Sequence, residues 1–154
     1  MKLDEKDLML LDLLQQDANI SNKEIADRVN LSMTPVYERI KKLMATSVLK
    51  QKVFLLDRRK LDLNLMVLVS ISMEKHSNES ALLFMEEIQK FPEVVECFHV
   101  TGAFDYQITV MARPVDPYHE FNFNKLPTLK RIRHMENYFV MNEFVNTTRL
   151  SIFL

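Results

Sequence analysis

One stretch, residues 20–43, limits what this chain can fold into more than any other part of it. The stretch contains two helix starts separated by a tight connection. Ser21 and Glu24 have the spacing of a capping box, in which the serine oxygen accepts a hydrogen bond from the amide of Glu24 and the carboxylate accepts one from the amide of Ser21. Asn30 is expected to end this first helix, because asparagine tolerates a left-handed backbone.

The second helix of this stretch divides into an apolar and a polar face. Ser32 offers its N-cap, and Pro35 lies in its first turn, where a missing N–H costs nothing. The apolar stripe, at helical spacing, consists of Val36, Ile40 and Leu43. At about 100° per residue, the opposite side carries Thr34, Glu38, Lys41 and Lys42, flanked by Tyr37 and Arg39. A short helix, a tight turn and a second helix with a basic outer face are typical of a helix-turn-helix, whose second helix enters the DNA major groove.

The alternative is an ordinary pair of amphipathic helices with a solvated charged face. The charge distribution favours DNA binding, although the 154-residue chain has a net charge of −1. Residues 1–60 hold 12 basic and 9 acidic residues, a net of +3, and residues 61–154 hold 8 and 12, a net of −4. Within residues 39–60 there are 8 basic residues and one acid. This asymmetry indicates a basic face on an acidic body.

The rest of the first half adds a helix, a strand and a hinge. Asp4 can cap a first helix over residues 5–16. Residues 48–56 are rich in Val, Leu and Phe and are expected to form a strand. Residues 57–63 are charged and lack periodicity, so a short hinge is expected there.

The second half has a different pattern, β-α-β-β-α-β. Strands are expected over residues 65–73, 94–100, 104–111 and 136–144, with helices over 78–90 and from Asp116 to about Leu126. The first helix is expected to bury Ala81, Phe84, Met85 and Ile88, and the second carries Tyr118, Phe121 and Asn122 on successive turns. This order is that of a ferredoxin-like fold, in which one sheet face lies under two helices and the other is free. An apolar free face needs a partner, so dimerisation through the sheet is expected.

The composition argues against secretion, membrane insertion and metal chemistry. No apolar run approaches the 18 residues of a membrane span, and the charged N-terminus lacks the apolar core of a signal peptide. Cys97 is the single cysteine and can form no internal disulfide, so a cytoplasmic protein is expected. The four histidines lack ligand spacing, and no nucleotide-binding or nucleophile motif is present, so no metal and no cofactor are expected.

Gly102 is the only glycine, where a chain of this size ordinarily has about ten. It is expected where no side chain is allowed. Other positions that require a positive φ must then fall to Asn or Asp.

Three segments resemble, in order, the Lrp/AsnC family of bacterial and archaeal transcription factors. ISNKEIADRVNLSMTPVYERIKKL at 20–43 resembles the family helix-turn-helix, VTGAFDY at 100–106 its loop between the second and third sheet strands, and YFVMNEFVNTTRL at 138–150 its last strand. The resemblance implies an α+β chain, with a winged-helix-like helix-turn-helix domain over 1–60 and a ferredoxin-like effector-binding and oligomerisation domain over 61–154. It also implies a homodimer assembling to an octamer, a palindromic operator in double-stranded DNA, and an amino-acid effector that shifts assembly or DNA affinity.

The residues predicted to contact DNA lie in and around the second helix. Phosphate contacts position a protein on DNA without reading its sequence. They are expected from Lys23, Arg28, Lys41 and Lys42. Base-edge contacts are expected from Thr34, Tyr37, Glu38 and Arg39, with Ser32 and Pro35 completing the predicted interface. Glu38 has an alternative role, which is to pair with Lys41 or Lys42 on the helix surface.

By resemblance, the effector loop consists of Thr101, Gly102, Ala103, Asp105 and Tyr106. Its alternative is a tight hairpin in which Asp105 only bonds nearby amides. Many family members carry an acid where Ala103 stands. Many also have a Pro-Gly turn where Lys130 and Arg131 stand, so the preceding helix is expected to break early, near Pro127.

Two other functions remain open at this point. One is a DNA-organising protein without a ligand response. The other is an enzyme that resembles the tetrapyrrole decarboxylases related to this family, for which the candidate residues are His99, Arg131, Arg133 and His134.

Overall fold

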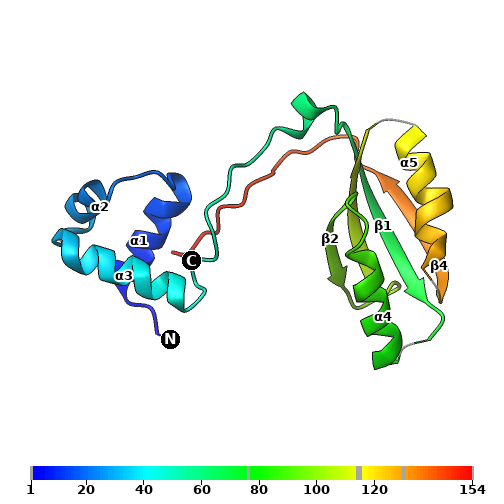
Figure 1. The fold of residues 1–154 in the computed structure, drawn as a ribbon, viewed down its shortest axis with the longest axis horizontal. Coiled ribbons are helices and arrows are strands. Elements are labelled where there is room, and N and C mark those ends of the chain that lie inside the picture. Colours follow the sequence, from blue (N-terminus) through cyan, green and yellow to red (C-terminus); the bar gives the residue numbers. More distant parts are fainter. Residues whose placement is uncertain (1, 76, 114–115, 130, 154) are drawn as a thin grey trace. The chain divides into compact units, whose positions relative to one another are not determined.

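The computed structural model describes residues 2–75, 77–113, 116–129 and 131–153, which form two compact units. The N-terminal unit comprises Met1–Leu55 with Val145–Leu154, and the sheet unit comprises Leu56–Phe144 (Figure 1). The last ten residues therefore lie with the N-terminal unit, although the sequence places them in the second domain. Polar bonds to α1 explain this: Arg149 Nη2 donates to Asp12 Oδ1 at 2.8 Å, and the Leu150 amide donates to Gln15 Oε1 at 2.7 Å.

The N-terminal unit contains three helices around a small apolar core. They are α1 (Glu5–Gln16), α2 (Asn22–Val29) and α3 (Met33–Ala45). Asp4 caps α1 as predicted, and its carboxylate and that of Asp7 accept each other's backbone amides in a capping box. The core residues of the three helices are Leu10, Ile25, Ala26, Val29 and Val36.

The caps of α2 and α3 follow the prediction only in part. Ser21 Oγ accepts from the Glu24 amide at 3.1 Å, but the reciprocal bond is absent because the Glu24 carboxylate instead binds Arg28 Nη2 at 2.6 Å. Asn30 ends α2 with φ 53°, as predicted. Ser32 occupies the N-cap position of α3 as predicted, although its side chain accepts no hydrogen bond from the helix backbone.

The strand predicted over residues 48–56 is wrong. Residues 48–50 end the turn after α3, and residues 51–57 form neither helix nor strand. Apolar side chains in this segment are strongly exposed, with Phe54 at 88% and Leu56 at 75%. A β-strand requires a neighbouring strand for its backbone bonds, and no strand of the described residues pairs with this segment. The expected hinge contains a 3-10 turn, η1 (Arg58–Leu61).

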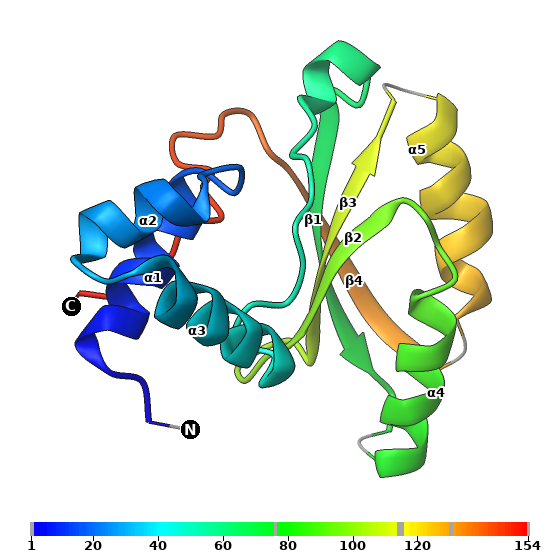
Figure 2. The ribbon, with the colours of Figure 1, turned by 60° about the vertical axis from the view of Figure 1, so that its left-hand side comes forward.

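The sheet unit has the predicted β-α-β-β-α-β order. Its elements are β1 (Leu65–Met73), α4 (Asn78–Ile88), β2 (Val94–His99), β3 (Tyr106–Ala112), α5 (Asp116–Glu120) and β4 (Ile132–Phe139). The strands form one antiparallel sheet in the order β2-β3-β1-β4. Helices α4 and α5 cover the same face of this sheet (Figure 2).

The core of the sheet unit lies between that face and the two helices. Alternate residues of β1 and β3 enter it, as the two-residue period of a strand requires. Fully buried examples are Val67, Val69, Ile71, Ile108 and Val110, and Phe84, Ile88, Phe121 and Leu126 pack against them from the helices. Met85 was predicted in the core, but it is 43% exposed, because α4 turns Ser80, Phe84 and Ile88 inward instead.

The chain between α5 and β4 is irregular. α5 continues into a π-helical turn, η2 (Phe121–Lys125), and a 3-10 turn, η3 (Leu126–Thr128), so the regular helix breaks before Pro127 as predicted. Lys130 lies outside the described residues, and Arg131 adopts a left-handed backbone with φ 74°. β4 begins directly after this turn. It starts four residues before the predicted start at 136 and ends five residues before the predicted end at 144.

Candidate nucleic-acid interface and effector loop

α3 turns one polar face away from the core of its unit. Val36 and Leu43 are fully buried and hold the helix against its neighbours. The predicted DNA-binding residues on the other side are exposed, namely Ser32, Thr34, Tyr37, Glu38, Lys41 and Lys42, while Pro35 is half-buried. The helix therefore presents aromatic, hydroxyl, carboxylate and ammonium groups to an approaching partner.

α2 contributes a flanking surface. Lys23 and Arg28 are both exposed, as phosphate contacts require. Arg28 is paired with Glu24 across one turn of the helix, and both side chains are about half exposed, so DNA phosphate can compete for the guanidinium.

Glu38 makes no ion pair with Lys41 or Lys42 in the described part of the chain. It lines a shallow hollow of about 450 Å³ together with Pro35, Arg39 and Lys42. Its carboxylate is thus not neutralised by the neighbouring lysines on the helix surface.

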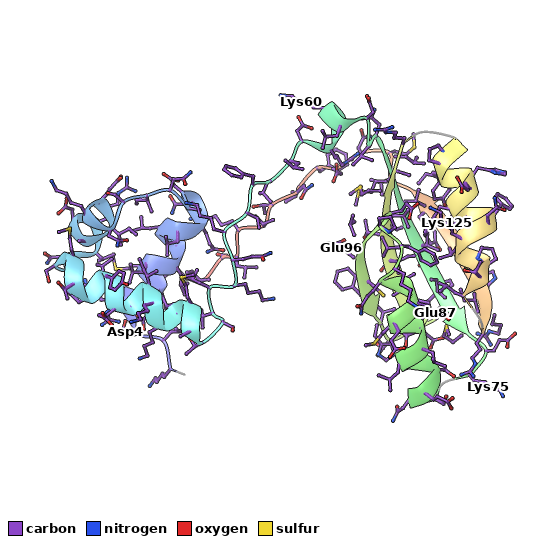
Figure 3. All side chains as sticks on the ribbon, viewed as in Figure 1. Asp4, Lys60, Lys75, Glu87, Glu96 and Lys125 are labelled. Carbon is purple, nitrogen blue, oxygen red and sulfur yellow. The ribbon has the colours of Figure 1, made fainter. Side chains whose placement is uncertain are left out.

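Arg39 differs from the other predicted DNA contacts because α1 holds it. Its Nη1 donates to Asp4 Oδ2 and to Asp7 Oδ1, both at 2.6 Å. These two carboxylates raise the pKa of the Arg39 guanidinium. The Asp7 amide and Arg39 together hold the pKa of Asp4 below its usual value (Figure 3, Asp4 labelled). The acids before and in the first turn of α1 indicate only a helix cap, so sequence spacing carries no signal for this contact.

The predicted effector loop joins β2 to β3. Thr101, Gly102 and Ala103 are exposed at its tip. Gly102 has φ 132°, and a Cβ placed on it would meet nothing within 4 Å. The glycine is therefore required by backbone conformation and not by lack of space, which corrects the sequence expectation.

Asp105 ties the base of this loop to β1. Its Oδ2 accepts from the Met73 amide at 2.8 Å, and its own amide donates to the Ile71 carbonyl at 2.9 Å. The hairpin alternative expects bonds from Asp105 to backbone amides, and the amide of Met73 belongs to the neighbouring strand β1. Tyr106, the next residue, is buried in the core, where its ring centroid lies 4.3 Å from that of Phe84. Burial raises the pKa of the Tyr106 hydroxyl.

Two contacts from the loop to other strands were not predicted. Ser72 Oγ donates to the Ala103 carbonyl at 3.3 Å, and the Phe104 ring stacks 6.2 Å from that of His134 in β4. A cavity of about 150 Å³ also lies at the loop's base, lined in part by Lys75, His99 and Asp105. The residues of these contacts are up to 31 positions apart, so only the sheet topology brings them together.

The described residues contain no group of three or more His, Cys, Asp or Glu side chains arranged to hold a metal ion. Within the same residues, no helix has both the length and the apolar character needed to cross a membrane.

Two family descriptions match the chain, in the order of its two units. An AsnC-type helix-turn-helix domain matches residues 3–44, and an Lrp/AsnC ligand binding domain matches residues 66–150. Among named relatives, the transcriptional activator DecR of Escherichia coli is 34% identical over 150 residues, covering 97% of this chain and 99% of DecR. The regulator AzlB of Bacillus subtilis is 31% identical, covering 97% and 96%.

Solved structures agree with these matches. An AsnC family regulator from Agrobacterium tumefaciens superposes with a TM-score of 0.88 at 32% identity, covering 97% of each chain. A transcriptional regulator from Neisseria meningitidis, solved in complex with L-Met, superposes with a TM-score of 0.90 at 27% identity, also covering 97% of each chain.

Proposed function

The chain belongs to the Lrp/AsnC family of transcriptional regulators, and we propose that it binds operator DNA through α3 and changes its assembly or DNA affinity when an amino acid binds to the sheet unit. The relatives carry the names of regulators, so the chain is a regulator and not an enzyme. The observation that carries the proposal is the exposed polar face of α3 opposite its buried Val36 and Leu43.

In the proposed complex, α3 lies in the major groove of double-stranded DNA. Lys41 and Lys42 contact phosphates together with Lys23 and Arg28, while Thr34, Tyr37 and Glu38 reach base edges. Arg39 contributes by fixing α3 against α1, because Asp4 and Asp7 both bind its Nη1.

A homodimer follows from this mode of binding, since two copies related by a two-fold axis read a palindromic operator. The sheet supports it. Its helix-free face carries Phe98 and Tyr138, which are 53% and 48% exposed, next to the half-buried Met66, Leu68 and Met111. We propose that this face contributes to the dimer and that dimers associate further, to an octamer.

The effector is proposed to bind at the tip of the loop, at Thr101, Gly102 and Ala103, between dimers. The exposure of these residues supports this site, and the L-Met in the Neisseria relative supports an amino acid as the ligand. An effector shifts assembly only by binding one assembly state more tightly than another.

The test is a titration of the purified full chain against the DNA upstream of its own gene, with nonspecific competitor DNA present and salt varied. Binding that survives the competitor and weakens steeply with salt supports a sequence-specific regulator. Absence of binding at low salt contradicts the helix-turn-helix assignment of function. The same probe then reports the effect of each amino acid on affinity, with sedimentation velocity reporting assembly.

Two observations favour a second candidate, a DNA-organising protein without a ligand response. Asp105 already accepts the Met73 amide, and Ala103 offers no carboxylate to an effector's ammonium group. This candidate predicts an unchanged DNA affinity and unchanged assembly across all amino acids.

A further inference from the structure

An open cavity of about 470 Å³ lies along the beginning of β4, where the chain enters the sheet. Its charged and titratable lining consists of Arg131, Arg133 and His134, and its apolar lining of Pro127, Leu129, Ile132 and Met135. No acid is among these residues. The volume is in the usual range of small-molecule sites, about 300 to 1,000 Å³. Two permanent cations beside an apolar wall suit a small organic anion.

The backbone directs Arg133 toward this space through a β-bulge. Ile132 pairs with Met73 and His134 pairs with Ser72, so Arg133 is the extra residue between two paired positions. A bulge re-aims the side chain it carries. Arg133 is exposed and has no hydrogen-bond or ion-pair partner in the described part of the chain, so its guanidinium donors are available to a ligand.

Arg131 is held from the opposite side. Its Nη1 donates to Ser80 Oγ in α4 at 2.9 Å, and its carbonyl accepts from the Glu74 amide at 2.8 Å. One bond leaves most of the five guanidinium donors free. The residue also adopts φ 74°, an unfavourable conformation for a residue with a Cβ, and such strain often marks functional sites.

The cavity adjoins the proposed effector loop. Phe104 of the loop stacks on His134 of the cavity lining, with ring centroids 6.2 Å apart. Glu136 of β4 bonds His134 Nε2 at 3.2 Å and also accepts from the Tyr138 hydroxyl. Glu136 is therefore already engaged, and among the described residues no ion pair joins Arg131 or Arg133 to an acid.

We infer that the ligand of the sheet unit is an acidic amino acid, whose side-chain carboxylate binds Arg131 and Arg133. This inference rests on the proposed function, because it specifies the effector of the same loop. The charge of the cavity supports it, because its lining gathers Arg131 and Arg133 and contains no acid. A guanidinium fork binds a carboxylate through two parallel hydrogen bonds, which an amide of the same shape cannot reproduce.

The test compares ligands of equal shape and different charge. Isothermal titration calorimetry on the full chain measures L-glutamate against L-glutamine and L-aspartate against L-asparagine, with inorganic phosphate as a separate probe. One acid is expected to bind at least about tenfold more tightly than its amide. Arg133→Met is expected to remove most of this preference. Arg113→Met, an exposed arginine outside the cavity, is the matched control and is expected to retain it.

A second variant, Arg133→Lys, tests the inference if Arg133→Met does not fold. Arg133→Lys keeps the charge and loses the fork, so it is expected to show an intermediate preference. Equal affinity for acid and amide overturns the inference and leaves the proposed function standing. Loss of phosphate binding in Arg133→Met, without any glutamate or aspartate preference in the unmodified chain, identifies a phosphate site and overturns it too.

Two further outcomes separate the inference from its premise. If no amino acid binds while operator DNA still does, the effector part of the proposed function and the inference both fail. If Arg133→Met leaves ligand preference unchanged but alters assembly, Arg133 protects the edge of β4 from other strands, and the inference is overturned.

Discussion

Arg39 of α3 donates from Nη1 to Oδ1 of Asp7 in α1 at 2.6 Å, and the Asp7 side chain is only 8% exposed. A nearly buried carboxylate thus receives a cation from the helix that is proposed to read DNA. Since α3 also carries the exposed Lys41 and Lys42, the position of these lysines depends on a contact made outside the DNA interface.

Replacement of Arg39 is expected to act through stability. Arg39→Ala leaves Oδ1 of Asp7 without its partner, at a cost of about 1–3 kcal/mol for an unpaired buried polar group. Chemical denaturation followed by circular dichroism is expected to show this loss, and DNA affinity is expected to fall for all sequences alike.

A specificity measurement provides the control for Arg39. Operators with single base-pair changes are titrated against the unmodified chain and Arg39→Ala. A relaxed preference at one base pair in the variant would show that Arg39 reads a base edge, which contradicts its assignment as an anchor of α3.

Lys42→Ala, unlike Arg39→Ala, is expected to weaken DNA binding without lowering the stability of the chain. Its ammonium group is exposed and has no ion-pair partner in the described residues, so stability is expected to change little. Loss of one phosphate contact is expected to lower the slope of log affinity against log salt by about 0.9. Lys90→Ala, an exposed lysine of the sheet unit, serves as the control. An unchanged slope in Lys42→Ala contradicts the phosphate contact.

Acid is expected to weaken the attachment of α1 to α3 through Asp4. The Asp7 amide and Arg39 lower the pKa of Asp4 below its ordinary value of 3.8. A lowered folded-state pKa gives a stabilisation that is fully present above pH 3.8 and is lost as the pH falls through the folded-state value. Thermal unfolding of the unmodified chain and of Asp4→Asn, measured from neutral pH downward, is expected to show a difference that shrinks below pH 3.8. A constant difference contradicts this linkage.

Asp105 offers a way to separate architecture from effector binding. Asp105→Ala removes the acceptor of the Met73 amide and is expected to destabilise the sheet unit by about 1–3 kcal/mol. Asp105→Asn retains an acceptor oxygen and is expected to cost less. Effector affinity that falls in Asp105→Asn while stability holds indicates direct contact with the ligand, and parallel loss of both indicates that Asp105 acts only by shaping the loop.

The local patterns predicted the elements of this chain well. The acids before α1 and the serine before α2 marked helix starts, and Asn30 marked a helix end, because these side chains satisfy backbone groups within four residues. The β-rich run at residues 65–73 predicted β1 with the bounds that the structure has.

Errors arose where a competing partner or the packing of whole elements decides the outcome. Residues 48–56 have strand composition, but no strand of the described residues pairs with them. The Glu24 carboxylate accepts from Arg28 and not from the amide of Ser21. Met85 has the spacing of a core residue, but the angle at which α4 packs leaves it exposed.

By itself, therefore, the sequence determined the order of helices and strands, the faces of α3 and the family resemblance, since these follow from periodicity and from contacts between near neighbours. Only the tertiary structure decided that Arg39 binds α1, that Phe104 meets His134, and that Arg131 and Arg133 line one cavity. These pairings depend on sheet order, helix packing and a bulge. Such features join residues far apart along the chain, where sequence spacing carries no information about distance.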